Sequence, residues 1–270
     1  MEGSPPFSQR RSMDTIKKRV QNSDCLMTAK VYKRDVCIGI SYIGRPPLRR
    51  DGTRKAIIGF SKRSAKRLRH IIRNSEDDWK AFITLTYPAE FPCNGRETKG
   101  HLNTFLQFLR RRNLKNVWIL EFQERGAPHY HIIVNGFIPK DELAKRWYKI
   151  VGSGDEKHLQ AGTRIEAIRS KQHLYGYLSG YINKLDQKIV PMEFENVGRF
   201  WGTSRNILEF VIHRFRNTYD VVTRSIRPLR KWYQSHVRGW AKGWKWKWQG
   251  QGFTAYDGAA FIDQMTAKCI

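Results

Sequence analysis

Three residues of this chain have the types and spacing of a metal site: Glu121, His129 and His131. Residues i and i+2 of a β-strand project from the same face, so both imidazoles can reach one ion. Pairing in a hairpin brings the glutamate, eight residues before the first histidine, beside them. Two neutral histidines and one carboxylate leave coordination positions open for water and a phosphate oxygen, as in a catalytic site. The alternative is a hairpin with surface histidines and a solvated glutamate.

A nucleophile is predicted on a helix over residues 170–185, which Ser170 caps. At 100° per residue, one edge of this helix holds four polar side chains, and an adjoining stripe of leucines is expected to be buried. The four are His173, Tyr177, Tyr181 and Lys184. A tyrosine hydroxyl has a pKa near 10, and a nearby metal ion and a lysine both favour its anion. Half-buried tyrosines at core spacing are the alternative, and a phosphate contact or surface position suits His173 better than a role as base.

The elements that must position these residues predict an α+β fold, with a central antiparallel sheet and helices packed on it. Hydrophobic patterns and breakers indicate the strands and helices. The strands are 31–42, 81–86, 117–122, 129–134 and 163–168, and the helices are 61–73, 101–112, 141–150 and 170–185. No GxxxxGK[ST] motif is present, which disfavours an ATPase or helicase and a nucleotide cofactor.

The charge of the chain indicates a polyanionic partner and three regions. Lys and Arg number 50 against 24 Asp and Glu, a net charge of +26 in 270 residues. Residues 1–75 are a basic N-terminal region, with 1–30 as a mobile DNA-binding arm and a possible added strand and helix. Residues 76–205 are a near-neutral catalytic domain, and residues 206–270 are a basic, Trp-rich C-terminal region. No apolar run approaches a membrane span, no secretory signal is visible, and the four cysteines form no CxxC pair, so we expect a cytoplasmic protein.

The C-terminal region interleaves tryptophans with cations. As a strand, Trp244 and Trp246 share one face, and Lys245 and Lys247 the other. Such a face can stack bases. Packing against the catalytic domain and a membrane-interface segment are the alternatives, and a membrane partner is the least favoured.

Taken in this order, the motifs resemble those of the HUH endonucleases of rolling-circle replication. The segments are FITLTYP (82–88), EFQERGAPHYH (121–131), YLSGYINK (177–184) and GRFWGTSR (198–205). The pattern is most similar to phage replication-associated proteins of the filamentous-phage gene II type, with two tyrosines as in the gene A type. It covers about residues 80–205. The histidines precede the tyrosines, as in replication initiators and some single-strand transposases and unlike relaxases.

The resemblance implies roles for individual residues. Glu121, His129 and His131 are the ligands of Mg²⁺ or Mn²⁺. Tyr181 matches the single-tyrosine form, and Tyr177 is the extra tyrosine. Lys184 stabilises the phosphate or positions the phenolate, and it contacts DNA together with Arg199 and Arg205.

The function implied is a rolling-circle replication initiator. It nicks one strand of a single-stranded or supercoiled origin, holds a 5′-phosphotyrosine and later religates, and a host polymerase and helicase are its expected partners. Three alternatives stay open. They are a non-catalytic basic DNA-binding protein, an HUH transposase or mobilisation nuclease, and, least favoured, a zinc metallohydrolase, which lacks HExxH here.

Overall fold

The computed structural model divides the chain into two compact units, each described here by itself. A central unit comprises Gly52–Leu208, and a terminal unit combines Met1–Asp51 with Glu209–Ile270. The structure describes residues 25–42, 57, 59–75, 78–170, 173–176, 178, 189–205, 207, 211–238 and 253–267.

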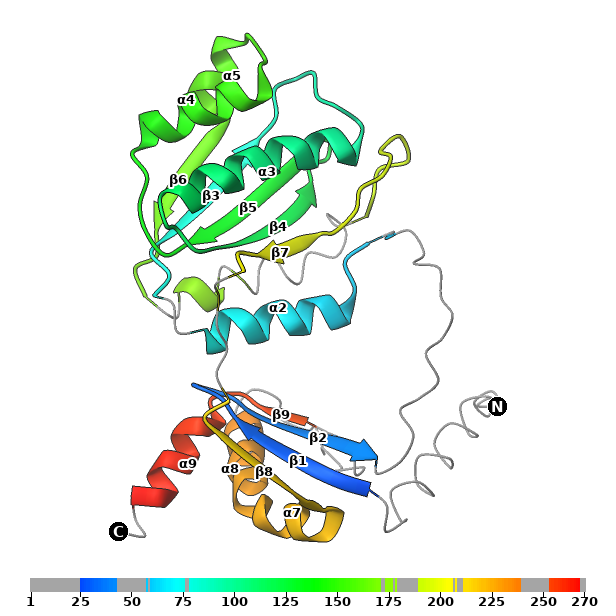
Figure 1. Ribbon diagram of the computed structural model, residues 1–270, viewed down its shortest axis with the longest axis vertical. Coiled ribbons are helices and arrows are strands. Elements are labelled where there is room, and N and C mark those ends of the chain that lie inside the picture. Colours follow the sequence, from blue (N-terminus) through cyan, green and yellow to red (C-terminus); the bar gives the residue numbers. More distant parts are fainter. Residues whose placement is uncertain are drawn as a thin grey trace, which may run out of the picture. The chain divides into compact units, whose positions relative to one another are not determined.

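The central unit is built on a five-stranded antiparallel sheet in the order β6-β3-β5-β4-β7 (Figure 1). Its strands are β3 (Ala81–Thr86), β4 (Asn116–Phe122), β5 (Pro128–Val134), β6 (Thr163–Ala167) and β7 (Trp201–Thr203). β4 and β5 form the hairpin that the sequence predicts, and Gly126 in its turn has a positive φ of 81°. The predicted α+β class, with helices on an antiparallel sheet, is confirmed and is consistent with an HUH-endonuclease-like fold.

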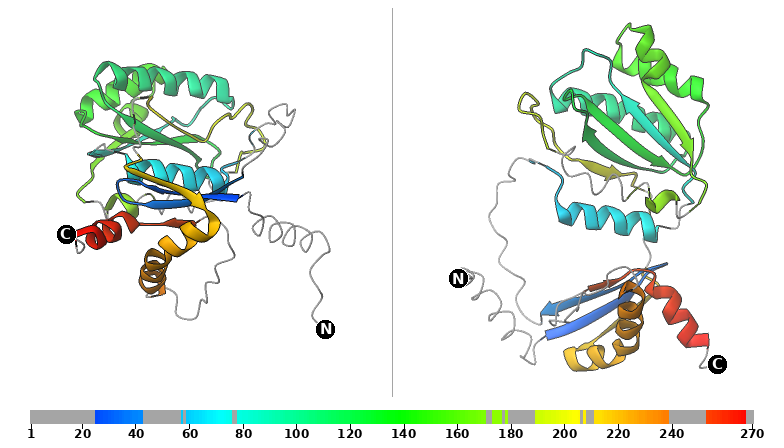
Figure 2. Two further views of the ribbon diagram at one scale, coloured as in Figure 1. Left: turned by 60° about the horizontal axis from the view of Figure 1, so that its bottom comes forward. Right: turned by 180° about the vertical axis from the view of Figure 1, so that it is seen from behind.

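Helices cover both faces of this sheet (Figures 1 and 2). On one face lie α3 (Gly95–Arg111) and α4 (Lys140–Val151), followed by the short α5 (Glu156–Ala161). On the other lie α2 (Lys62–Asn74) and a helical segment that includes residues 173–176. Both layers contribute buried apolar side chains to one core around the sheet. Those of the helices include Leu68, Ile72, Leu102, Phe105, Leu109, Leu143, Trp147, Leu174 and Leu178.

α3 begins six residues earlier than the sequence pattern predicts. Asn94 caps it, accepting a hydrogen bond from the Arg96 amide at 2.8 Å. A Cβ at Gly95 would lie 2.1 Å from the backbone oxygen of Asn196, so the first turn can pack here only with glycine. An Asn-Gly pair is a common turn signal. Here the pair begins a helix, and the segment that packs against its first turn lies about 100 residues away in the chain.

The terminal unit is a second antiparallel sheet, which the sequence analysis does not anticipate. Its order is β8-β1-β2-β9. The strands are β1 (Cys25–Val31), β2 (Val36–Tyr42), β8 (His213–Thr218) and β9 (Phe253–Ala255), and the helices are α7 (Tyr219–Ser225), α8 (Arg227–Arg238) and α9 (Gly258–Ala267). The helices pack on one face over Met27, Ala29, Val36 and Ile38.

The boundaries between the two units therefore differ from the region boundaries expected at residues 75 and 205. α2 belongs to the central unit, because Leu68 and Ile72 are buried in its core. The segment 31–42, expected as one strand, turns at residues 32–35, where the Tyr32 amide donates to the Asp35 carbonyl. The arm expected over 1–30 includes β1 from Cys25 onward, because β1 pairs with β8 from the far end of the chain.

Lys99 on α3 is half-buried, and its side-chain nitrogen is fully buried against the sheet. Its Nζ lies 4.5 Å from the ring centroid of Trp118 and 5.2 Å from that of Tyr130. Among the described residues this nitrogen has no hydrogen-bond partner. Burial lowers the pKa of Lys99 to about 7, so the folded chain gives up this proton far more readily than the unfolded chain does.

This shift predicts a pH dependence of stability. Between about pH 7 and 10.5 the unfolded chain binds a proton that the folded chain lacks. The free energy of unfolding therefore rises with pH over this range, and the gained stability is lost again as the pH falls to about 7. The slope is at most about 1.4 kcal/mol per pH unit. We expect Lys99→Met to flatten this rise, measured by urea unfolding from about pH 7 to pH 9. Parallel curves for the two proteins would contradict the prediction.

Candidate active site

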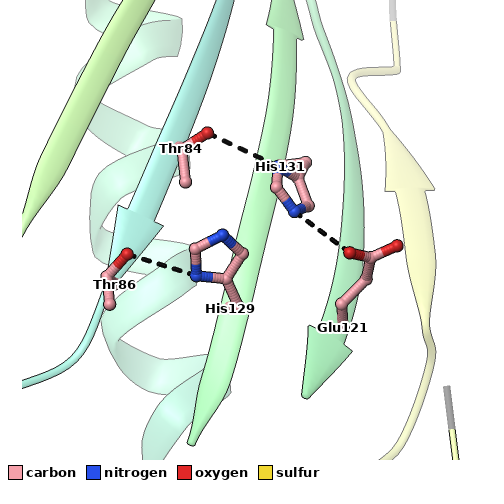
Figure 3. Close-up of polar contacts among 5 residues, drawn as sticks. All are labelled: Thr84, Thr86, Glu121, His129 and His131. Carbon is pink, nitrogen blue, oxygen red and sulfur yellow. Dashed lines mark hydrogen bonds and ion pairs between the residues drawn. The ribbon is translucent and has the colours of Figure 1, made fainter. Parts of the chain in front are cut away.

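The strand register brings the three predicted metal ligands onto one face of the central sheet. Glu121 of β4 is the direct partner of His129 on the neighbouring β5. His131, two residues further along β5, projects from the same face. Figure 3 shows the two rings side by side between β3 and β4, with the carboxylate on the β4 side. The hairpin predicted from the sequence thus places these residues as expected.

Two of the three predicted ligands are in direct contact. The Nε2 atom of His131 lies 3.2 Å from Oε2 of Glu121, and both side chains are only 4% exposed. The rings of His129 and His131 have centroids 4.5 Å apart, edge to face. Within the part of the chain that the structure describes, no three His, Cys, Asp or Glu side chains converge on one ion position. The arrangement is thus a buried Glu121–His131 pair with His129 beside it.

Two threonines of β3 contact the other nitrogen of each ring. Thr86 Oγ1 lies 3.2 Å from Nδ1 of His129, and Thr84 Oγ1 lies 3.4 Å from Nδ1 of His131 (Figure 3). Both contacts follow from the register, since each threonine is the direct β3 partner of its histidine. When Nδ1–H donates to the hydroxyl oxygen, the lone pair of Nε2 is available to a metal ion.

The end of β3 is held by two side chains from the helices on the opposite face. The Thr86 carbonyl oxygen accepts a hydrogen bond from the indole Nε1 of Trp147 at 2.8 Å, and Nε2 of His158 lies 2.9 Å from the same oxygen. A carbonyl can only accept, so this His158 nitrogen carries the proton, and Nδ1 faces the Ser153 hydroxyl at 2.8 Å. Burial lowers the pKa of His158, which favours this neutral ring.

The electrostatics of the site favour a bound cation. A carboxylate buried this deeply is costly unless a hydrogen bond or an opposite charge compensates it. Nε2 of His131 lies 3.2 Å from the Glu121 carboxylate and compensates its charge only when that nitrogen carries a proton. A divalent ion can supply the same compensation, and the donor set of one carboxylate and two imidazoles suits Mg²⁺, Mn²⁺ or Zn²⁺. The residues present therefore fit the metal that the sequence predicts.

The predicted nucleophile helix is described only in part. Residues 173–176 and 178 are helical, and Ser170 caps them as predicted, with its Oγ accepting from the His173 amide at 3.0 Å. The helix packs on the face that bears the histidines, because the His173 ring contacts Phe82, whose neighbours on that face of β3 are Thr84 and Thr86. The predicted catalytic residues Tyr177, Tyr181 and Lys184 lie outside the described residues.

The predicted DNA contacts Arg199 and Arg205 are exposed and lie on either side of β7. Both line a pocket of about 730 Å³ that follows the β7 edge between α3 and α2, together with Arg67. An adjoining pocket of about 520 Å³ is lined by Arg110 and again by Arg205. None of the described residues that line either pocket is acidic.

Two further predictions concern the Trp-rich segment and membrane spans. Trp244, Lys245, Trp246 and Lys247 are outside the described residues. Where the chain is described, it contains no helix with both the length and the apolar character needed to cross a membrane.

Comparison with known proteins finds a family match within the central unit. Residues 80–186 match the family of replication-associated proteins described as ORF2 or gene II protein. The match supports a rolling-circle replication initiator family for this chain, and its range includes both histidines and both tyrosines. Neither the curated proteins nor the solved structures contain a match to the chain.

Sequence reasoning missed the residues that contact the candidate metal ligands. Thr84 and Thr86 stand two apart in the predicted strand, so a period of two already places them on one face. Their partners could not be identified, because the pairing of β3 with β5 joins residues 43 and 47 positions apart. Trp147 and His158 were likewise not identified as supports of this strand.

Proposed function

We propose that the central unit is a metal-dependent endonuclease that cuts one DNA strand with a tyrosine and keeps the 5′ end covalently attached. The observation that carries this proposal is the shared sheet face of Glu121, His129 and His131, with each histidine Nδ1 beside a threonine hydroxyl. This geometry leaves the Nε2 atoms to act as ligands. The family match supports a replication initiator as the biological role.

Glu121, His129 and His131 would hold Mg²⁺ or Mn²⁺. When bound, the ion polarises the scissile phosphate and offsets the charge that builds up on its oxygens. The protein's own residues prepare the site for this charge. Thr84 and Thr86 contact Nδ1 of each ring and so help to orient it, and the buried position of Glu121 excludes water that would weaken its field.

The nucleophile in this proposal is Tyr181, with Tyr177 as a second tyrosine. The phenol oxygen attacks phosphorus, its proton passes to solvent, and the bond from phosphorus to the 3′ oxygen breaks. A phosphotyrosyl bond forms on the 5′ side, and the 3′ oxygen takes up a proton to become a free hydroxyl. One phosphodiester is exchanged for another, so religation needs no nucleotide cofactor. Lys184 neutralises charge on the phosphate.

The paired tyrosines suit a reaction that must be performed twice. While one tyrosine holds the first 5′ end, the other can cut the regenerated junction. The free 3′ hydroxyl can prime a host polymerase, and a host helicase would open the duplex ahead of it. In this proposal the protein acts in the cytoplasm of the host cell.

The β7 edge offers a path for the DNA strand that enters this site. The arginines of its two pockets, among them Arg110, Arg199 and Arg205, present cations without an acidic neighbour in the lining. Trp201 of β7 pairs with Ile119, which lies on the same face of β4 as Glu121. A strand bound along this edge by its phosphates would therefore lie beside the pair of strands β7 and β4, of which β4 carries Glu121.

The test is formation of a covalent protein–DNA adduct. A supercoiled plasmid that carries the gene region is incubated with the protein and Mn²⁺, then denatured, and nicked DNA bearing protein is measured. We expect an adduct that His129→Ala and the double variant Tyr177→Phe/Tyr181→Phe both abolish, and that Tyr181→Phe alone reduces at the first cut. Full nicking by Tyr181→Phe with none by Tyr177→Phe would reverse the assignment of the two tyrosines.

The alternatives have distinct outcomes in the same experiment. A non-catalytic DNA-binding protein would bind the plasmid equally well in all variants and form no adduct. It would also form no adduct on a tiled set of single-stranded oligonucleotides. An adduct mapped to the ends of a mobile element rather than to an origin would identify a transposase or mobilisation nuclease.

A further inference from the structure

The sheet of the terminal unit has one face that its described helices leave open. Met27, Ala29, Val36 and Ile38 form the buried face, on which α7 and α8 pack through Val222 and Leu229. In Figures 1 and 2, α7, α8 and α9 all lie on the same side of this sheet. Residues that alternate with the buried set point to the opposite side.

That opposite side, here called the open face, is cationic. Its described side chains belong to Leu26, Thr28, Lys30, Cys37, Arg214, Arg216 and Thr254, with Gly39 among them. Arg214 and Arg216 are exposed, and Lys30 is half-buried. None of these residues is acidic or aromatic. Within the described parts of the chain, neither these two arginines nor Lys30 forms an ion pair.

The register sets the cations against each other. Lys30 of β1 is the direct cross-strand partner of Arg214 on β8, and Arg216 is the partner of Thr28 two residues along. Like charges in directly opposite positions destabilise a sheet. A bound anion removes this repulsion, so the arrangement is favourable when a polyanion lies across the two strands.

The surface is also shaped for a broad partner. Gly39 is exposed, and a Cβ built on it would have no atom within 4 Å, so the centre of the face is flat and open. Glycine within a strand often marks a place where another molecule's backbone approaches closely. Single-stranded nucleic acid usually binds to aromatic side chains on which bases stack, and the described residues of this face offer none. Cations and small polar residues instead suit binding to backbone phosphates, which does not depend on the base sequence.

We propose that the open face of the terminal unit binds the phosphate backbone of duplex DNA. This gives the chain a duplex-binding surface separate from the strand-cleaving site of the central unit. It rests on the proposed function only in taking DNA as the partner. The unit as a whole suits this role, because its residues 1–51 and 209–270 carry 22 Lys and Arg against nine Asp and Glu.

The experiment compares two double variants of the full chain that lose the same charge from opposite sides of the unit. Arg214→Gln/Arg216→Gln alters the open face, and Arg227→Gln/Lys231→Gln alters exposed positions on α8. Binding to a blunt duplex of about 30 bp is measured by fluorescence anisotropy from about 50 to 200 mM KCl. We expect the open-face variant to lose about tenfold or more in affinity and to reduce the salt slope by about 2, with little change for the α8 variant. Equal losses in both would overturn the proposal, and so would unchanged binding in both.

A second pair of variants tests the same face without removing an arginine. Gly39→Glu adds a carboxylate at the open centre, and Gly39→Gln adds a neutral side chain of nearly the same size; neither Cβ meets a neighbour. We expect weaker duplex binding for the glutamate variant alone. Cleavage of a single-stranded oligonucleotide, measured in parallel, should stay unchanged in all four variants. Loss of duplex binding with intact cleavage supports the inference, whereas absent cleavage in every protein, the unmodified one included, would count against the proposed function alone.

Discussion

Glu121→Gln is expected to lower the rate of single-strand DNA cleavage by about 10²–10⁴-fold. In the proposed mechanism a bound metal ion stabilises the transition state by several kcal/mol, and the variant loses a negatively charged ligand of that ion. The amide keeps the size of the buried side chain and loses its negative charge. In the folded protein the change alters the 3.2 Å contact between Glu121 and Nε2 of His131. The measurement is the rate of cleavage of an origin oligonucleotide over a Mn²⁺ titration, with thermal unfolding as a check on the fold.

Glu166→Gln is the matched control. Glu166 lies on the same face of the sheet, on β6, where it is the partner of Phe82, and it pairs with Arg164 at the surface. An exposed ion pair contributes little to stability, so this variant should cleave as the unmodified protein does. If Glu121→Gln cleaved normally, or if the two variants lost activity equally, Glu121 would not be a metal ligand.

Trp147→Ala is expected to destabilise the central unit by about 3–5 kcal/mol. The side chain is fully buried, and its ring packs edge to face against Tyr87 and Phe105. Removing it leaves a cavity between α4 and β3 and deletes the hydrogen bond to the Thr86 carbonyl. For a domain of this size the unfolding midpoint should fall by roughly 6–20 °C, measured by thermal denaturation.

Two further variants separate packing from the hydrogen bond. Trp147→Phe keeps most of the buried ring and loses the indole N–H, so it should cost less than the alanine variant. Lys145→Ala changes an exposed position on the same helix and should shift stability by less than about 0.5 kcal/mol. A Trp147→Ala protein as stable as Lys145→Ala would show that this helix does not support the strand.

Both predictions concern one chain of contacts through the sheet. Trp147 and His158 on one face hold the end of β3, and the Thr86 side chain on the other face contacts His129. The candidate site therefore depends on packing that lies behind it. We expect a change in this packing to shift the candidate metal ligands as well as to lower stability.

Much of the central unit could be predicted because its signals are local. Short runs of β-favouring apolar residues indicated β3, β4 and β5, and a short Gly- and Pro-containing link indicated the hairpin of β4 and β5. Once the hairpin was assumed, the period of two placed His129 and His131 together and Glu121 beside them. The structure agrees, with Glu121 and His129 as direct partners.

The terminal unit could not be predicted, because its sheet joins segments from both ends of the chain. β1 pairs with β8 nearly 190 residues later, and β2 pairs with β9. No local pattern specifies such a partner, since pairing depends on which apolar faces are buried together. The basic composition of the two flanks indicated a shared partner and gave no sign that they form one sheet.

By itself the sequence determined the α+β class, the hairpin that carries the candidate ligands, and the cationic character of both ends. These depend on residue type and on spacing within a few positions. Only the tertiary structure decided that Thr84 and Thr86 orient the histidines, that Trp147 and His158 hold their strand, and that Lys30 faces Arg214 on an open sheet. Those contacts join residues far apart in the chain, and their partners are set by strand register and by the burial of a common core, which no short segment contains.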